Sequence, residues 1–246
     1  MRLHSPLLSE LPGLVHAFST RQGGVSPPPQ GSLSLALRGA GTPEQVRENW
    51  VRFLSPHPTD ALAICDQVHG CGVVVVDEGQ GPLHTVAQGD ALVTTTQGVW
   101  IAVRTADCVP ILLAAPGGVA AVHAGWRGTV ASIVGEAVES LCAQAGCAPS
   151  EVRAAIGPCI SLDAYEVGPE VVGALEGLDL QVCVQRSQSG RTQVDLARAN
   201  RLLLHRFGVQ RVDVLGCCTF RDPRFFSHRR DGAATGRMAS FVGLLP

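Results

Sequence analysis

Apolar residues recur along the chain with two spacings, one typical of helices and one typical of buried strands. After Thr42 and Pro43, apolar side chains return every three or four positions up to residue 54, which predicts a helix over 43–54 capped by Thr42. The pattern then changes to short β-branched or apolar runs separated by Gly, Pro and Asp. These runs predict strands of a buried sheet at 73–76, 91–95, 99–103, 109–114 and 119–122.

The second half of the chain alternates helical and strand patterns. Residues 127–145 place their apolar side chains on one helical face before Gly146 and Pro149, which predicts one long helix. Four further elements are predicted: strands at 152–156 and 212–217, and helices at 169–175 and 195–207, the last capped by Asp195. No internal repeat or linker divides the chain. We therefore expect an α/β or α+β fold, a single domain over 1–246 with a central mixed β-sheet flanked by helices.

Charge and hydropathy argue against two classes of partner. The formal net charge of -2 comes without a run of like charges, so no nucleic-acid partner is expected. The longest apolar stretch, residues 109–122, is interrupted by prolines and glycines and is too short to cross a membrane. Pro6, Glu10 and Pro12 interrupt the first apolar region, so we expect no signal peptide and a cytoplasmic location.

The 9 cysteines are arranged neither as a disulfide framework nor as a short zinc motif. Their number is odd, and no Cys-x-x-Cys pair occurs. We interpret most of them as small buried hydrophobic residues in a reducing compartment. The cysteines interpreted in this way are Cys65, Cys71, Cys142, Cys147, Cys159 and Cys183.

Three short segments place metal-binding or nucleophilic side chains at predicted strand ends, each beside Gly or Pro. They are Gln-Val-His-Gly at 67–70, Thr-Ala-Asp-Cys-Val-Pro at 105–110 and His-Ala-Gly-Trp-Arg-Gly at 123–128. In the third, a buried strand runs into a turn with two glycines, where the backbone can approach a ligand closely before a helix begins. The start of that helix, which carries Arg127, favours an anion.

Several long motifs of the chain resemble those of one known family and occur in the same order. They are Phe-Ser-Thr-Arg-Gln-Gly-Gly-Val-Ser at 18–26, Gly-Asp-Ala-Leu-Val-Thr at 89–94, Gly-Pro-Cys-Ile at 157–160, Tyr-Glu-Val at 165–167 and Phe-Ser-His-Arg-Arg-Asp-Gly at 226–232. The family is that of the laccase-domain proteins, once called multicopper polyphenol oxidases and now associated with purine nucleoside phosphorylase and adenosine deaminase activities. The resemblance implies these activities here, together with methylthioadenosine phosphorylase activity, and purine nucleosides and phosphate as partners.

The same resemblance implies a metal site with His69, Cys108 and His123 as ligands. The separations of 39 and 15 residues between them match no short zinc signature by themselves. A thiolate and two imidazoles suit zinc, and three protein ligands leave a fourth tetrahedral position open for catalysis. Copper can occupy such a site in vitro, because it binds most nitrogen and sulfur sites more tightly than zinc does.

Further roles follow from the resemblance and from the needs of phosphorolysis. A phosphate beside the ribose requires fixed positive charge near the metal, and Arg127 is expected to act there with Cys108 and His123 as the catalytic set. Four residues of the matched segments are expected to bind substrate or phosphate: Arg21, Ser19, Arg229 and His228.

Three other positions bear on the site. Ser34 stands where the family usually has Asn, which puts the substrate preference in doubt. Asp107, next to Cys108, is expected to make a structural hydrogen bond rather than to pair with it in catalysis. Trp126 either packs in the core or stacks on a base, and the sequence leaves both interpretations open.

Three alternative functions use the same residues or the same family. A multicopper oxidase normally has paired His-x-His motifs, and none occurs among the 8 histidines. A metal-free cysteine hydrolase would use Cys108 as nucleophile and His123 as base. A role in editing cell-wall precursors would require a site for a larger, nucleotide-linked substrate. The preferred nucleoside and the oligomeric state are left open.

Overall fold

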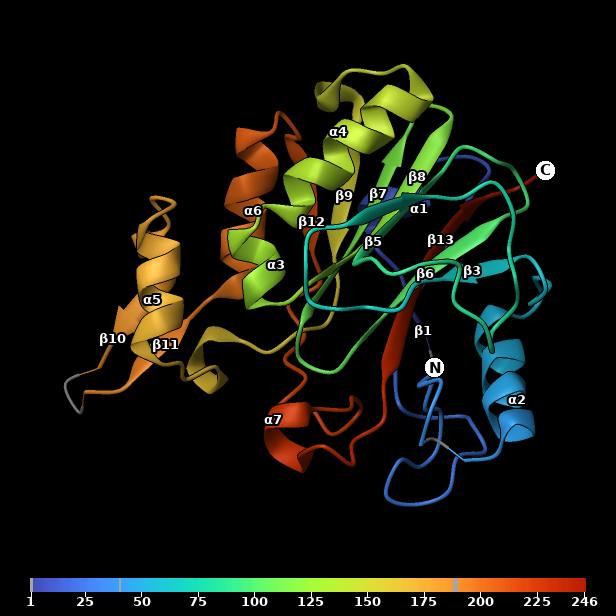
Figure 1. Ribbon diagram of the computed structural model, residues 1–246, viewed down its shortest axis with the longest axis horizontal. Coiled ribbons are helices and arrows are strands. Elements are labelled where there is room, and N and C mark those ends of the chain that lie inside the picture. The colour runs from blue at the N-terminus through green and yellow to red at the C-terminus, as the bar shows by residue number, and fades with distance from the viewer. Residues whose placement is uncertain (1, 40, 188–189) are drawn as a thin grey trace.

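Two mixed β-sheets pack face to face around a shared apolar cluster (Figure 1). The computed structural model describes residues 2–39, 41–187 and 190–246. The five-stranded sheet has the order β1 (Arg2–Leu3), β2 (Leu14–Ser19), β13 (Met238–Leu244), β6 (Trp100–Thr105) and β3 (Leu62–Ile64). The six-stranded sheet has the order β12 (Arg211–Val214), β9 (Arg153–Ile156), β7 (Val109–Ala115), β8 (Gly118–Ala124), β5 (Ala91–Thr94) and β4 (Val73–Val75).

The predicted α/β class with mixed strand pairing is confirmed. Strands β3 and β6, β4 and β5, and β9 and β12 pair in parallel, whereas the other neighbours in the two sheets pair antiparallel. The strands form two sheets instead of the one central sheet that we expected. Strands β5 and β6 follow each other in the sequence, yet they belong to different sheets.

Strand β7 shows how both faces of the six-stranded sheet are buried. Ile111 and Leu113 belong to the apolar cluster on the helix side, whereas Leu112 and Ala114 belong to the cluster between the sheets. Successive side chains of a strand point to opposite faces, so a strand covered on both faces is apolar at every position. The unbroken apolar run at 109–114 therefore reflects burial on two sides.

Helices cover the outer faces of the two sheets (Figure 1). Helix α2 (Pro43–Leu54) packs Trp50 and Phe53 against the five-stranded sheet, and Thr42 forms the predicted cap with Gln45. Helices α4 (Ile133–Ala145) and α6 (Leu196–Arg206) cover the six-stranded sheet, and Asp195 caps α6 as predicted. Both predicted N-terminal caps are thus confirmed.

The remaining elements are short. They are the helices α1 (Pro6–Ser9), α3 (Trp126–Val130), α5 (Pro169–Glu176) and α7 (His228–Asp231), the 3-10 turns Pro149–Glu151, Leu162–Ala164 and Gln181–Cys183, and the hairpin of β10 (Val184–Arg186) and β11 (Thr192–Val194). No helix in the described part of the chain is long and apolar enough to cross a membrane.

Two further sequence predictions differ from the structure. The single helix expected at 127–145 is two helices, because Ser132 adopts a left-handed conformation with φ of 57° that ends α3 and starts α4 in a new direction. The interpretation of Cys71 as buried is wrong, since it is exposed in the loop before β4. All nine cysteines are free, so the structure contains no disulfide framework among them.

We expect Gly135→Ala to lower the free energy of unfolding by about 1–3 kcal/mol, a typical cost of overpacking. A Cβ atom at this position of α4 would lie 2.2 Å from the Phe207 ring, so helix or ring must shift. Gly173→Ala in α5 is the matched control, because a Cβ atom there would have no neighbouring atom within 4 Å. The control is expected to be neutral or stabilising by up to about 1 kcal/mol through helix propensity. Urea unfolding measures the free energy of unfolding of both variants. Equal changes in the two variants would contradict the packing argument.

Candidate active site

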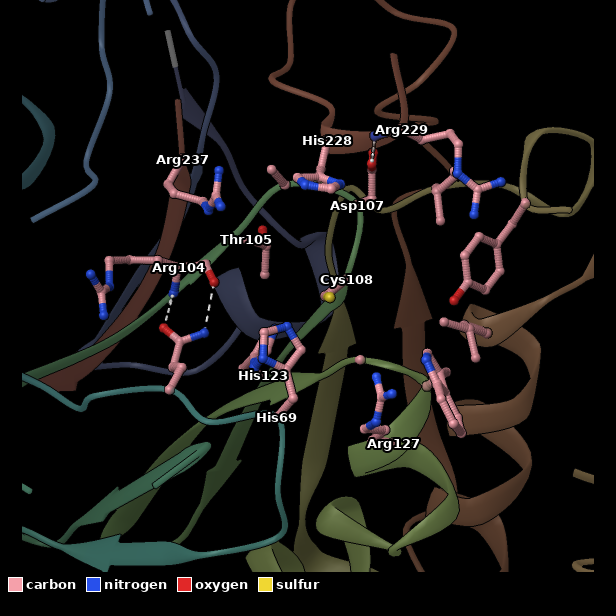
Figure 2. A pocket seen from close by; sticks show the side chains of 17 residues that line it. His69, Arg104, Thr105, Asp107, Cys108, His123, Arg127, His228, Arg229 and Arg237 are labelled. Atoms are coloured by element: carbon pink, nitrogen blue, oxygen red, sulfur yellow. Dashed lines mark hydrogen bonds between the residues drawn. The ribbon is translucent and has the colours of Figure 1, made fainter. Parts of the chain in front are cut away.

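Three side chains from separate segments meet at one end of the six-stranded sheet (Figure 2). His69 lies in the loop before β4, Cys108 in the bend between β6 and β7, and His123 near the end of β8. One donor atom from each side chain, two imidazole nitrogens and a thiol sulfur, lies within 4.8 Å of the others. His123 is buried, Cys108 is half-buried and His69 is exposed, so the cluster reaches from the core to the surface.

Strand pairing brings Cys108 to His123. In the antiparallel pair of β7 and β8, Val109 lies opposite Ala124 and Pro110 opposite His123, so the residue before β7 reaches the end of β8. Cys108 ends the bend at 106–108, through which the chain passes from the five-stranded to the six-stranded sheet. The thiol therefore lies where the two sheets meet.

Gly125, between β8 and α3, leaves room for two members of the cluster. A Cβ atom at this position would lie 3.2 Å from Cys108 Sγ and 3.2 Å from His69 Cδ2. These separations are shorter than the optimal van der Waals distance, so a side chain here would push both groups away. Gly125 was expected to let the backbone approach a ligand, and it lies directly against the cluster.

The carboxylate of Asp90 holds two of the three segments together. Its Oδ1 atom accepts a hydrogen bond from His123 Nδ1 at 2.7 Å and one from the His69 backbone N–H at 3.0 Å. Its Oδ2 atom accepts from the backbone N–H groups of Gly70 at 2.7 Å and Val68 at 3.3 Å. With Nδ1 engaged, the other ring nitrogen of His123 is left to face Cys108.

Hydrogen bonding keeps this carboxylate charged although it is buried. Burial alone would raise the pKa of Asp90, but its bonds with His123 and the loop N–H groups outweigh burial and hold the pKa below its usual value. His69 adopts a positive φ of 61°, which is uncommon for a residue with a side chain. The bond from its own N–H to Asp90 helps to hold this loop conformation.

The electrostatics of the cluster favour a thiolate. Burial alone would raise the pKa of the Cys108 thiol, but His123 beside it and the hydrogen bonds of both histidines lower that pKa to about 6. Burial alone would lower the pKa of His123, but the Cys108 thiolate and the bond to Asp90 raise that pKa to about 9, so the pair is a thiolate and an imidazolium. A bound cation would displace the imidazole proton, and one thiolate and two neutral imidazoles are then a donor set that suits zinc. Tetrahedral zinc with such ligands has donor atoms about 3.5 Å apart. The observed upper limit of 4.8 Å is within a small side-chain adjustment of that arrangement, so the residues fit a metal.

A cavity of about 540 Å³ opens beside this cluster. Its lining includes four arginines, Arg104, Arg127, Arg229 and Arg237, and the aromatic side chains of Trp126 and Tyr165. The structure gives none of these four arginines an ion pair with a carboxylate among the described residues. The cavity is therefore a place where an anionic or polar ligand would meet unpaired positive charge.

The structure brings some of the sequence-predicted binding residues to the cavity and leaves others away from it. Arg127, Arg229 and His228 line it. Ser19 and Arg21 are not among its lining residues. The hydroxyl of Ser19 accepts a hydrogen bond inside the five-stranded sheet, and the Arg21 guanidinium lies 4.6 Å from the centre of the Phe226 ring. Both sit in a matched segment, but their side chains pack within the fold.

Several cavity residues were missed from the sequence. Arg104 directly follows the strand predicted at 99–103, and Tyr165 was interpreted only as part of a matched motif. Gln67 and Thr105 were interpreted only as neighbours of candidate ligands. The sequence analysis assigned no role to Arg237. A charged residue directly after an otherwise apolar predicted strand, as at Arg104, was the available signal.

Asp107 makes the structural hydrogen bonds that we expected. Its Oδ1 atom accepts from the Thr219 hydroxyl at 2.6 Å and its Oδ2 atom from the Arg229 backbone N–H at 2.7 Å. These bonds fix α7 beside the cavity. Ser34, which replaces the family Asn, is buried, and its hydroxyl accepts from the Arg237 backbone N–H at 3.3 Å. This substitution therefore contacts a residue that lines the cavity.

Comparison with known proteins agrees with these observations. Residues 15–245 match a family model described as multi-copper polyphenol oxidoreductase laccase. A protein of Deinococcus radiodurans named purine nucleoside phosphorylase is 43% identical over 233 residues, which cover 93% of this chain and 88% of the relative. A protein named adenosine deaminase RL5, from an unknown prokaryotic organism, is 36% identical over 94% of this chain and 93% of its own length.

Solved structures share the fold. The crystal structure of YlmD from Geobacillus stearothermophilus matches with a TM-score of 0.91 and 35% identity, and the match covers 98% of this chain and 94% of that one. The structure of a Neisseria meningitidis protein, NMB0706, matches with a TM-score of 0.87 and 35% identity over 100% and 99% of the two chains. The resemblance seen in the sequence motifs is confirmed, and the chain belongs to the multi-copper polyphenol oxidoreductase laccase family.

Proposed function

We propose that the chain is a zinc-dependent purine nucleoside phosphorylase that also deaminates adenosine and cleaves methylthioadenosine. The observation that carries the proposal is the His69, Cys108 and His123 cluster, which opens into a cavity lined by four arginines that form no ion pair with a described carboxylate. The names of its relatives, purine nucleoside phosphorylase and adenosine deaminase, support the two reaction classes.

His69, Cys108 and His123 would hold the metal, and Asp90 would orient His123 through the bond to Nδ1. A zinc ion in such a site supplies a Lewis acid and activates water at neutral pH. Trp126 and Tyr165 offer aromatic surface for a purine base at the same cavity. The copper in the family name is compatible with this proposal, because a thiolate and two imidazoles bind copper as well as zinc. Elemental analysis of the purified protein identifies the metal.

Arg127 is the residue that we propose for the phosphate co-substrate. Its guanidinium lies over the Trp126 ring, 4.3 Å from its centre, and it lines the cavity beside the metal cluster. The sequence also predicted a contribution from the dipole of the helix that begins here. Helix α3 has only 5 residues, so this contribution is small and the guanidinium carries the proposal. Arg229, whose guanidinium donates to the Glu166 carbonyl, and His228 are neighbouring donors.

A second candidate function is favoured by one observation. The lowered pKa of Cys108, about 6, would also suit a cysteine nucleophile with His123 as its base. Such an enzyme would need no metal. The proposed phosphorylase, in contrast, would lose phosphorolysis and deamination when the metal is removed. The two functions therefore differ in whether activity survives removal of the metal.

We expect purified protein to hold about one zinc per chain and Cys108→Ser to lose most of it, because a hydroxyl is a far poorer anionic ligand than a thiolate. Phosphorolysis and deamination should then fall together. Elemental analysis and assays of both reactions on the same sample measure this. Cys71→Ser is the matched control, an exposed cysteine two residues after His69 that is expected to keep metal and activity. A Cys108→Ser protein that keeps its zinc and loses all turnover would support the cysteine nucleophile instead.

We expect Arg127→Ala to keep its zinc and to lower the phosphate-dependent reaction about 10- to 100-fold, the usual value of a charged hydrogen bond. Deamination should fall less, because it needs no bound phosphate. Inosine phosphorolysis and adenosine deamination, measured over a range of phosphate concentrations, separate the two effects. Arg47→Ala, on the exposed face of α2, controls for the loss of one positive charge. If both activities fall equally, Arg127 does not bind the phosphate co-substrate.

A further inference from the structure

Two cysteines contact each other at the C-terminal end of helix α4. The Cys142 and Cys147 sulfur atoms lie 3.7 Å apart, with the Cys147 thiol as the hydrogen-bond donor. Cys142 lies in the last turn of α4, and Cys147 follows directly after Gly146, which caps the helix. Both thiols are free, and neither belongs to the metal cluster. The pair is therefore a separate group of two nucleophilic side chains.

The backbone that ends α4 holds these two residues together. Gly146 adopts a left-handed conformation with a φ of 66°. The backbone N–H groups of Gly146 and Cys147 both donate to the Cys142 carbonyl, at 2.9 Å and 3.2 Å. In such a Schellman-type ending, the side chains at the positions of Cys142 and Cys147 usually make an apolar contact. Here thiols occupy both positions, so the contact between the sulfur atoms follows from the backbone.

The two thiols differ in their access to solvent. Cys142 is 9% exposed, whereas Cys147 is half-buried just beyond the helix end. Burial raises the pKa of the Cys142 thiol to about 12, and its hydrogen bond with Cys147 acts in the same direction. Cys142 therefore stays a neutral thiol at neutral pH. A small dissolved oxidant meets Cys147 first, with the Cys142 thiol in contact with it.

The cysteine pair lies far from the metal cluster. A Cβ atom at Gly118, the first residue of β8, would lie 2.9 Å from Leu141 Cδ1 and 3.1 Å from Ala145 Cβ. The C-terminal end of α4 therefore covers the start of β8. His123 lies near the other end of this strand, about 16 Å further along at the usual rise per residue. Oxidation at the pair should thus leave the metal ligands in place.

We propose that Cys142 and Cys147 are a reversible oxidation site that forms a disulfide when a peroxide reaches the protein. The Cys147 thiolate attacks one oxygen of hydrogen peroxide, which breaks the O–O bond, gives a sulfenic acid and releases hydroxide. The Cys142 sulfur then attacks the Cys147 sulfur, so that the S–S bond forms, the S–O bond breaks and water leaves. The two thiols lose two electrons and two protons, and the peroxide is reduced to two water molecules.

The second thiol limits how far the oxidation proceeds. A sulfenic acid without a nearby thiol is oxidised further to a sulfinic acid, which ordinary thiol reductants do not reverse. The contact with Cys142 directs the sulfenic acid of Cys147 to a disulfide instead, and a dithiol reduces this disulfide again. This oxidation does not depend on the proposed nucleoside chemistry, because it uses none of the groups of the metal cluster.

Oxidation of the metal-loaded protein by hydrogen peroxide, at a dose that oxidises the exposed Cys71, tests the site. Free thiols are then alkylated and the peptides analysed by mass spectrometry. Trypsin releases residues 128–153 as one peptide, because no Arg or Lys lies between Arg127 and Arg153. We expect this peptide to lose the mass of two hydrogen atoms and to take up no alkylating reagent. Dithiothreitol should restore both thiols, and circular dichroism verifies that the protein stays folded.

Three variants separate the roles of the two thiols. In Cys142→Ser, dimedone, which traps sulfenic acids, should label Cys147 about 10-fold more than in the unsubstituted protein, because the sulfenic acid no longer condenses. Cys147→Ser should give neither the disulfide nor a label on Cys142, which is buried. Cys71→Ser is the matched control, an exposed cysteine outside the pair whose loss should leave the disulfide unchanged.

Equal dimedone labelling of Cys147 in Cys142→Ser and in the unsubstituted protein would overturn the proposal. A disulfide between either cysteine and a third cysteine would do the same, and so would a pair that stays reduced while Cys71 is oxidised. A disulfide that forms only when circular dichroism shows unfolding also overturns it. If Cys142→Ser does not fold, the ratio of disulfide to dimedone adduct on Cys147 in the unsubstituted protein decides alone.

Discussion

The arrangement of the candidate active site depends on one buried carboxylate. Asp90 accepts hydrogen bonds from His123 and from three consecutive backbone N–H groups of the His69 loop. A charge this far from water is unfavourable unless its oxygens are satisfied, and here four donors satisfy them. The same bonds give His69 its uncommon backbone conformation and decide which nitrogen of His123 faces the thiol. The hydrogen bonds that satisfy the buried carboxylate of Asp90 are therefore the same bonds that orient His69 and His123.

The two sheets contribute different chemistry to the same cavity. The six-stranded sheet carries Asp90 and His123 at the ends of neighbouring strands, and the five-stranded sheet carries Arg104 and Arg237. Cys108 lies on the bend that joins them. Since the apolar cluster between the sheets fixes their relative position, core packing and the spacing between the His69, Cys108 and His123 cluster and these arginines are coupled. A shift of one sheet against the other would separate the groups.

Local signals in the sequence predicted the elements better than their arrangement. The caps Thr42 and Asp195 were identified because capping depends on residues within one turn. The break at Ser132 was missed because the apolar period continues through it, and the division into two sheets was missed because strand order depends on long-range pairing. The metal cluster was identified through family motifs, since no local spacing marks it. Asp90 and Arg237 act through partners far away in the sequence, which a single sequence does not reveal.

Strand β13 lies between β2 and β6, so residues near position 240 separate strands formed by residues near positions 17 and 102. Contacts between such distant residues form slowly, because a large loop must close before they contribute any stability. During synthesis on a ribosome, the edges of β2 and β6 that later pair with β13 stay unpaired until more than a hundred further residues have been translated. The nascent chain therefore passes through a long interval with open strand edges, in which chaperones rather than native partners would protect it from aggregation.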